Sequence, residues 1–377
     1  MGFENLSLLE LQQLWWIVIA LLGGLFVFIM FVQGGQTLLN KLSTNETEKT
    51  MLINAIGRKW ELSFTTLVLF GGALFAAFPL FYSTSFGGAY WVWLAILFCF
   101  IIQAVSYEYR SKPNNFLGQK TYEFFLYVNG TLGVFLLGVA IATFFSGSEF
   151  SVDIHNFSHW ENPLRGLEAL FNPYNWLLGL ALVFLTKISG ALYFISYIDH
   201  QGIRDRAVQS IKVNMIFFLI FFLSFLGMTL TMDGYSVDAN GVISLEAFKY
   251  LHNFLELPVV LAMFVIGVGM VIVGVFVAIE YRKTCCIKTA GAGMVLTVMA
   301  LILIAGLNNT SYYPSTFDMQ SSLTIMNSSG SHYTLTAMSY AALMIPFVLA
   351  YITYAWYSMD KVKITKEEIE APDAHNY

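Results

Sequence analysis

Nine stretches of about 20 predominantly apolar residues run along this sequence, and they decide which folds are open to it. A lipid bilayer offers no hydrogen-bond partners to backbone groups, so a single segment that crosses it satisfies those groups only as a helix. The predicted spans cover residues 13–33, 63–83, 89–107, 122–146, 175–198, 212–231, 257–280, 290–307 and 335–357. We therefore expect an all-α polytopic membrane protein, with two four-helix bundles plus one further helix.

The composition agrees with membrane insertion. Of the 377 residues, 57% are hydrophobic and 11% are charged, whereas soluble domains carry about 25% charged residues. The net charge of −5 is small and spread along the chain, so no nucleic-acid partner is implied. We interpret residues 1–360 as a single transmembrane helical domain and residues 361–377 as a cytoplasmic tail.

The basic residues predict an orientation, because lysine and arginine are retained on the cytoplasmic side of a membrane. With the N-terminus outside and the C-terminus inside, only Arg165 and Lys249 lie in outward segments, and Lys187 lies within a span. The other sixteen of the nineteen then face inward: Lys41, Lys49, Arg58, Lys59, Arg110, Lys112, Lys120, Arg204, Arg206, Lys212, Arg282, Lys283, Lys288, Lys361, Lys363 and Lys366.

Two long outward segments, residues 147–174 and 308–334, are rich in aromatic residues, serine and asparagine. Disordered segments carry fewer aromatic residues, because they bury too little apolar surface to fold. We therefore expect both segments to form ordered caps over the helices.

The histidines are poorly placed to bind a haem. Haem iron in a membrane bundle needs histidine, methionine, cysteine or tyrosine at matched depths on facing helices. None of the six histidines falls in the interior of a predicted span; they are His155, His159, His200, His252, His332 and His375. We expect no haem ligated by this chain and no metal site within it.

Lys187 lies near the middle of the fifth predicted span. A charge at that depth is costly, and its side chain does not reach either membrane surface from there. Two interpretations remain open. Lys187 pairs with an acid or a cofactor propionate in a functional site, or it forms a structural ion pair inside the bundle.

Three carboxylates stand where spans meet the predicted inner surface: Glu61, Glu108 and Glu123. A carboxylate near an apolar boundary can exchange protons near neutral pH, so the three are candidates for a proton-collecting rim. The alternative is that they are ordinary interfacial acids paired with nearby lysines and arginines.

The second span has small residues in its middle: Gly71 and Gly72, followed by Ala76. Gly72 and Ala76 are four residues apart, the spacing that lets another helix approach closely. This predicts that the second span is buried against neighbouring helices.

Several motifs, taken in order, resemble subunit II of the cytochrome bd-type quinol oxidases. They are INAIGRKWE (53–61), GGALFAAFPLFY (71–82), YEYRSK (107–112), MDGY (232–235), SSLT (321–324) and ITKEEIE (364–370). The resemblance implies a heterodimer with subunit I in the bacterial cytoplasmic (inner) membrane. Subunit I of that family ligates the b-type haems and haem d and oxidises quinol. The complex reduces oxygen to water and builds a proton motive force.

For this chain the resemblance implies a scaffold and the start of a proton route from the cytoplasm. Trp60 and Glu61 match a Trp-Asp pair of the family, whose acid is placed at the mouth of that route. Glu108 and Glu123 are weaker candidates. Whether a quinone or lipid binds within this chain stays open.

The sequence departs from the family pattern at two places. Many relatives carry an acidic DGFD-like stretch where this chain has VQGGQ, with Gln33 and Gln36. Many also have an Arg-Pro pair where this chain has Gln103 and Ala104. Amides do not exchange protons as carboxylates do, which puts a proton route through the first span in doubt.

Two other classes of function remain as alternatives to an oxidase subunit. A secondary transporter would show interrupted helices at matching points of two halves, with polar groups at the midplane. A purely structural membrane scaffold is the third class. The residues alone do not separate the three.

Overall fold

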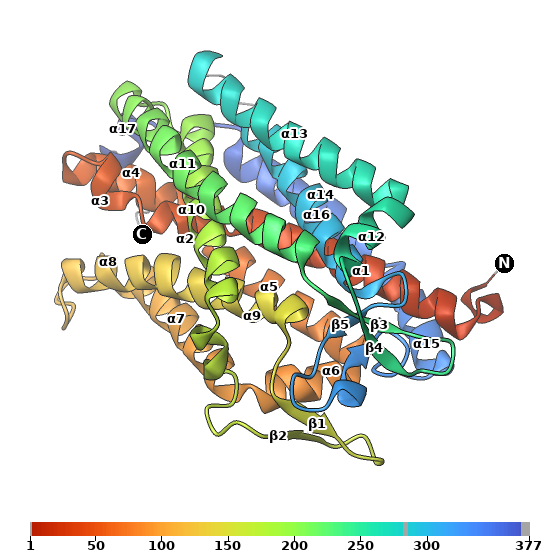
Figure 1. Cartoon of the computed structure of the whole chain (residues 1–377). Helices are drawn as coiled ribbons and strands as arrows, with labels where there is room; N and C mark the ends of the chain where they lie inside the picture. Colours follow the sequence, from red (N-terminus) through yellow and green to blue (C-terminus); the bar gives the residue numbers. More distant parts are fainter. Residues whose placement is uncertain (1, 282–285, 371–377) are drawn as a thin grey trace.

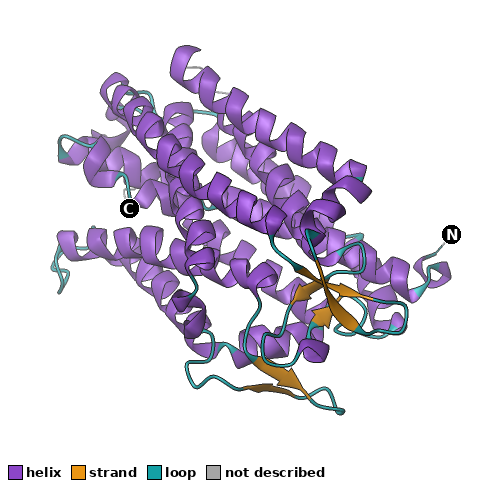
Figure 2. Cartoon of the chain, viewed as in Figure 1, coloured by secondary structure: helices purple, strands orange, loops and turns teal. Residues whose placement is uncertain are grey.

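The computed structural model describes residues 2–281 and 286–370. Arg282 and Lys283 of the predicted inward set, His375, and residues 371–377 of the predicted tail lie outside this part. Within it, nine helices are long and apolar enough to cross a membrane, and all nine predicted spans are found among them. Figures 1 and 2 show a helical molecule with short strands at one end. The strands of the described residues form three two-stranded sheets.

The spanning helices are often built from two or three shorter elements, and their bounds are as follows. They are α1 (Leu8–Ile29) with α2 (Phe31–Gln36), α4 (Glu46–Gly57) with α5 (Trp60–Ala77), α7 (Tyr90–Tyr109), α8 (Gln119–Val128) with the π-turn η3 (Asn129–Gly133) and α9 (Val134–Ser146), α10 (Pro173–Tyr197), α11 (Gln201–Thr231), α13 (Pro258–Tyr281), α14 (Cys286–Gly306), and α15 (His332–Ala342) with α16 (Ile345–Asp360). Short helices lie between them: α3 (Leu39–Leu42), α6 (Pro79–Tyr82), α12 (Lys249–Glu256) and α17 (Lys366–Glu370).

The first eight spans pack in two groups of four. In the first group α1 contacts α5, α7 contacts α8 and η3, and α2 also contacts η3. In the second group α10 pairs with α11, and α13 pairs with α14. The groups join where α1 packs on α14 and where α10 packs on α2 and α9.

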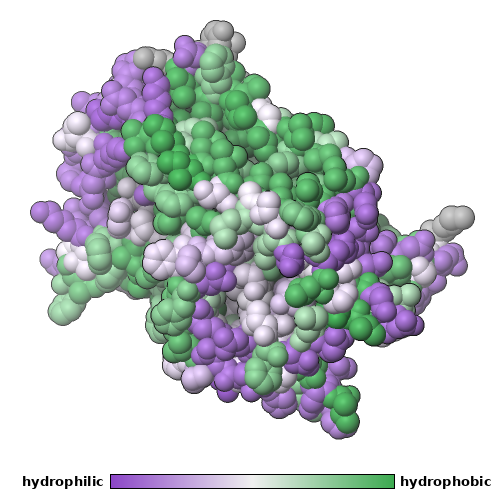
Figure 3. Space-filling model, in the orientation of Figure 1, coloured by the Kyte–Doolittle hydropathy of each residue, from purple (hydrophilic) through white to green (hydrophobic). Residues whose placement is uncertain are grey.

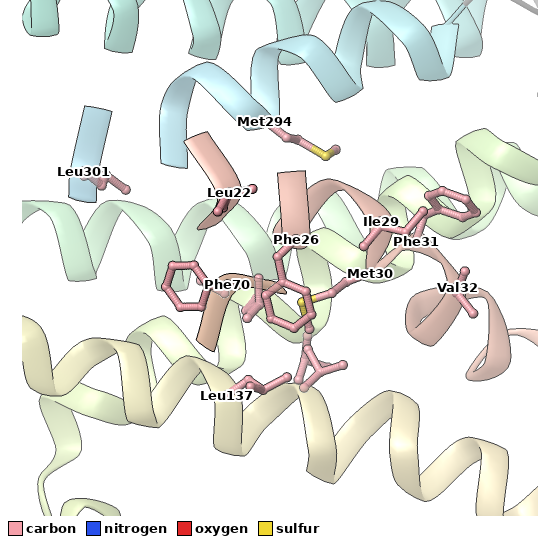
Figure 4. Packing of buried hydrophobic residues seen from close by; sticks show 14 of the residues in the cluster. Leu22, Phe26, Ile29, Met30, Phe31, Val32, Phe70, Leu137, Met294 and Leu301 are labelled. Atoms are coloured by element: carbon pink, nitrogen blue, oxygen red, sulfur yellow. The ribbon is translucent and has the colours of Figure 1, made fainter. Parts of the chain in front are cut away.

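Helix α1 runs through the centre of the molecule. Trp16 and Met30 on this helix are fully buried, and the Trp16 indole N–H donates to the Ile302 carbonyl of α14 at 3.1 Å. Figure 4 shows Phe26 and Met30 pointing toward Leu137 of α9. This helix therefore supplies much of the contact between the two groups of four.

Glycine permits the close contact between α2 and α10. A Cβ atom on Gly34 would overlap the backbone carbonyl of Thr186, and one on Gly190 would lie 2.5 Å from the backbone nitrogen of Gly35. Because these neighbours are backbone atoms, they cannot move aside cheaply. Any side chain at Gly34 would force the two helices apart.

Three pairs of short strands cover one end of the molecule, and two of the pairs lie in the long segments that were predicted to form ordered caps. Strands β1 (Phe150–Val152) and β2 (Ser158–Trp160) pair in the first cap, and β5 (Ser311–Tyr313) and β6 (Leu323–Thr324) pair in the second. A third pair, β3 (Gly234–Val237) and β4 (Ile243–Glu246), joins them through a bridge between Ser236 and Thr310. The caps are ordered and contact one another.

The opposite end, here called the basic end, carries most of the lysines and arginines. Arg110 ion-pairs with Glu46, Arg206 donates to the Leu42 carbonyl, and residues 198 and 364 form a backbone bridge. These contacts gather the segments after the first, third, fifth and ninth spans. Figure 3 shows apolar side chains over the middle of the molecule and hydrophilic ones toward its two ends.

Glu246 anchors the third strand pair to α12. Burial raises the pKa of its carboxyl, but hydrogen bonds from His252, Lys249 and Ser236 outweigh burial and lower the pKa to about 2. The Lys249 and His252 side chains lie 2.9 Å from the carboxylate. The ionised form is therefore the one that the fold stabilises.

We expect Gly34→Ala to destabilise the protein by about 1–3 kcal/mol, because the added methyl group collides with the α10 backbone. Thermal unfolding of the purified protein in detergent measures this. Gly227→Ala on α11 is the control, since a Cβ there meets no atom within 4 Å. Equal unfolding midpoints for the two variants would show that α2 and α10 can move apart at little cost in free energy.

The stability supplied by Glu246 should be full above the unfolded pKa of about 4.5 and lost as the pH falls toward 2. Glu246→Gln should therefore lower the unfolding free energy by up to about 1 kcal/mol at pH 7, since a half-exposed ion pair is screened. The difference from wild type should shrink at pH 3. Glu161→Gln, in another cap, should change neither value.

Candidate functional site

Glu61 lies at the start of α5, on the surface of the chain near the basic end. Its carboxylate forms no ion pair with any of the described residues. Trp60, its neighbour, points inward and stacks on the Tyr107 ring of α7, with ring centroids 5.8 Å apart and planes 11° apart. An exposed carboxylate, that of Glu61, thus lies next in the chain to a ring stack that extends into the protein.

Glu108 and Glu123 lie in quite different surroundings. Glu108 is exposed and pairs with Lys112 at 3.2 Å, one turn along the same helix. Glu123 is buried and pairs with Arg110 at 2.8 Å and with Lys49 at 3.2 Å. Both fit the interpretation as paired acids, and no hydrogen bond joins any two of the three predicted carboxylates. Whether the three carboxylates act together as one proton-collecting rim stays a prediction.

The small residues of the second span do not pack as predicted. A Cβ on Gly72 would meet no atom within 4 Å, and Ala76 is partly exposed. Gly71 is buried, but a Cβ there would touch only the Phe86 ring, at 3.4 Å. The prediction that this face is buried within the chain is wrong, because the face turns away from the other described helices. No described residue of this chain covers Gly72.

Lys187 has no acidic partner among the described residues. Its ammonium group lies 5.3 Å from the centre of the Phe184 ring, one turn earlier on α10. The expected ion pair inside the bundle is therefore absent from the part of the chain that the structure describes. No described residue of this chain supplies an anion to the Lys187 ammonium group.

Five polar side chains from three helices, α2, α5 and α7, meet inside the first group of helices. The Gln33 amide nitrogen donates to Ser63 and to the Gln103 amide oxygen, at 2.8 Å each. The Gln36 nitrogen donates to Gln103 at 3.0 Å and to the Tyr107 hydroxyl at 3.2 Å. All five side chains are no more than 2% exposed. We call this set the amide cluster.

The amide cluster was visible in the sequence only as single departures from the family pattern. Gln33, Gln36 and Gln103 were noted because amides stand where relatives have acids and an arginine. Nothing in the linear spacing shows that the three touch, because Gln103 is 67 residues from Gln36. The crossing of α2 and α7 brings them together.

Several amide atoms in and beside the cluster have no hydrogen-bond partner. They are Gln33 Oε1, Gln36 Oε1, Gln103 Nε2, and both Nδ2 and Oδ1 of Asn129. Asn129 begins the π-turn η3, which packs against the Gln33 backbone at Gly130. Reversing the three glutamine amides only exchanges which atoms lack a partner. Buried amides of this kind are normally satisfied by internal water.

A second polar group at the basic end ties the ninth span to the others. Lys59 is fully buried, and its ammonium lies 2.8 Å from Asp360 of α16. The Tyr193 hydroxyl and the Trp356 indole also donate to Asp360, at 3.2 and 2.5 Å. In the sequence Lys59 stands out as an inward-facing basic residue and as a possible partner of the interfacial acids. Asp360 was not predicted to be its partner, although it lies next to the basic tail.

The histidines do not form a haem site in the described part of the chain. His155, His159, His252 and His332 are exposed, and His200 caps the start of α11 beside Glu48. The same part contains no group of three or more histidine, cysteine and acidic side chains that could hold a metal ion.

Comparison with known proteins identifies the family. Residues 11–359 match the family model described as "Cytochrome bd terminal oxidase subunit II". The chain is 27% identical to "Cytochrome bd-I ubiquinol oxidase subunit 2" of Escherichia coli (strain K12), over 96% of this chain and 97% of the relative. It is also 27% identical to "Cytochrome bd ubiquinol oxidase subunit 2" of Bacillus subtilis (strain 168), over 95% of this chain and 98% of the relative.

A solved structure agrees in fold. A chain from "The structure of bd oxidase from Geobacillus thermodenitrificans" superposes with a TM-score of 0.66 at 13% identity, covering 93% of this chain and 98% of that one. The family model spans nearly the whole membrane domain, including the Trp60–Glu61 pair and the amide cluster. The chain therefore belongs to the family of subunit II of the cytochrome bd terminal oxidases.

Proposed function

We propose that this chain is the subunit of a cytochrome bd-type terminal oxidase that does not ligate haem. It pairs with a subunit I in the bacterial cytoplasmic membrane, and the complex oxidises quinol and reduces oxygen to water. The match of residues 11–359 to the subunit II family carries this proposal. The family match also favours an oxidase subunit over a transporter or a scaffold without enzymatic partner.

The haems of the complex, haem b and haem d, are ligated by subunit I. The positions of the described histidines support this division, because four are exposed and the fifth caps a helix. In the complex, haem supplies the electron transfer to oxygen. This chain supplies helices against which subunit I packs and side chains that deliver protons.

The basic end faces the cytoplasm. Lysines and arginines from four connecting segments gather there, which supports this orientation because basic segments are retained on the cytoplasmic side. The strand caps then face outward. Protons used in oxygen reduction are taken up from the basic end, and this uptake builds the proton motive force.

The exposed face of α5, together with α16, is the surface for subunit I. Glu61, Gly72 and Phe75 lie on this face of α5, and α15, which continues into α16, contacts α5. Phe347 and Tyr351 of α16 are 70% and 71% exposed. A small residue such as Gly72 lets a helix of another subunit approach closely, and Glu61 then lies at the subunit boundary.

Glu61 is the proton collector at that boundary. Its carboxylate takes a proton from cytoplasmic water and releases it along the subunit boundary toward the oxygen site. Trp60 stacks on Tyr107 and so fixes the start of α5 against α7. Glu123 is held by Arg110 and Lys49 and serves to position these helices. Glu108 is exposed and remains a weaker candidate for collecting protons.

The amide cluster lies directly behind this inlet, through Tyr107 and Gln36. Its amides do not titrate, so protons cross it only along water that its unpartnered oxygen and nitrogen atoms hold in place. Burying the same unpartnered amide atoms without water would cost folding free energy. A hydrated cluster thus supports a polar branch beside Glu61 without carboxylates in the first span.

We expect Glu61→Gln to lower oxygen-reduction turnover on the order of tenfold while the haem spectrum stays unchanged, because an amide cannot relay protons. Glu61→Asp should retain most of the activity. Oxygen consumption by the purified complex with excess quinol measures both, and Glu370→Gln, at an exposed acid of α17, is the matched control. Full turnover in Glu61→Gln would remove the proposed role of Glu61.

We expect Gln103→Leu to lower the unfolding free energy by about 1–3 kcal/mol, because Gln33 and Gln36 each lose an acceptor deep in the protein. Thermal unfolding of the purified complex measures the change. Gln13→Leu, at an exposed position of α1, should have little effect. If Gln103→Leu is as stable as wild type, the cluster contributes nothing to stability.

A further inference from the structure

Lys187 lies closer to the basic end than its place in α10 suggests. The Phe184 ring stacks on Phe217 and Phe221 of the antiparallel helix α11, with centroids 5.1 and 5.8 Å apart. Helix α11 is polar from its start at Gln201 up to Lys212 and apolar beyond it. Lys187, one turn nearer the basic end than Phe184, therefore lies within about one turn of Lys212, where the polar part of α11 ends.

A second lysine lies near Lys187. Lys41 lies on α3, which directly follows α2; α2 packs on α10 beside Lys187, and α3 contacts α11. The Lys41 side chain is exposed. Neither lysine forms an ion pair with any residue that the structure describes. Two like charges at the edge of the apolar layer are unfavourable unless an anion joins them.

The backbone around the two lysines is held firmly. Gly34 of α2 packs on the Thr186 carbonyl and the Lys187 nitrogen, which fixes α10 against the segment that leads to Lys41. Helix α3 is tied to α11, because the Arg206 Nε donates to the Leu42 carbonyl at 2.6 Å. The spacing of the two cations is therefore set by the fold.

Apolar side chains cover the surface just below the two cations. Phe217 and Val213 of α11 are 44% and 48% exposed, on the flank of α11 that carries the Phe184 contact. A ligand that satisfies this surface needs an anionic head at the level of the lysines and apolar tails below it. An anionic phospholipid has both parts in this order.

We propose that Lys41 and Lys187 bind the phosphate of an anionic phospholipid in the leaflet at the basic end, with its acyl chains along Phe217 and Val213. Lysine suits this role because its ammonium acts as a point charge toward phosphate on a flexible stem. Basic pockets between membrane helices on the cytoplasmic side bind lipid head groups in this way. The site is separate from the Glu61 inlet and does not depend on the proposed proton route.

The test is the thermal unfolding midpoint of the purified complex in detergent, titrated with phosphatidylglycerol, with phosphatidylcholine and with inorganic phosphate. The wild-type midpoint should rise with phosphatidylglycerol alone. Lys187→Met and Lys41→Gln should each raise the half-saturating phosphatidylglycerol concentration about fivefold, equal to about 1 kcal/mol per lysine near an anionic surface. Lys187→Arg should restore most of the binding, which separates loss of charge from misfolding.

Lys212→Met is the matched control, since Lys212 is an exposed lysine at a similar level of α11 outside the pair. It should titrate like wild type. The proposal is overturned if Lys187→Met binds phosphatidylglycerol as tightly as wild type, or if inorganic phosphate raises the midpoint equally. It is also overturned if a carbodiimide crosslinks Lys187 to a carboxylate of subunit I in the intact complex, since the anion would then come from protein.

Discussion

The close contact between α2 and α10 determines where the polar groups of this protein lie. Gly34 lets the two backbones meet, and Gly35 and Gly190 continue the contact. The glutamines on either side of these glycines, Gln33 and Gln36, are thereby turned toward α7 and away from α10. The same contact sets Lys187 beside the segment that leads to Lys41. One backbone approach thus joins the two groups of helices and positions both polar sites.

The spans could be predicted from the sequence because lipid leaves the backbone no alternative to a helix. Pairing of Glu123 with Arg110 was also within reach, since both stand at the same predicted membrane surface. The amide cluster was not, because it depends on how α2 crosses α7. Gly72 was misjudged because small residues at helical spacing show that a helix can approach, without showing whether it belongs to the same chain.

The sequence placed Lys187 only by its own apolar run. That run gives a position along the helix and no contact with a neighbouring helix. The ring contacts of Phe184 with α11 give the depth instead, because Lys212 ends the polar part of α11. In a helical hairpin the partner helix can locate the membrane surface better than the helix that carries the charge.

Asp360 has a consequence for biogenesis. Helix α16 has no buried residue, and among the described residues it is attached at its basic end, where Asp360 binds Lys59 and Tyr193 and Trp356 stacks on Phe28. At the other end the same span is held through α15, which contacts α1 and α5. Because Asp360 is the final residue of α16, its ion pair with Lys59 can form only after the whole of the last span has been made.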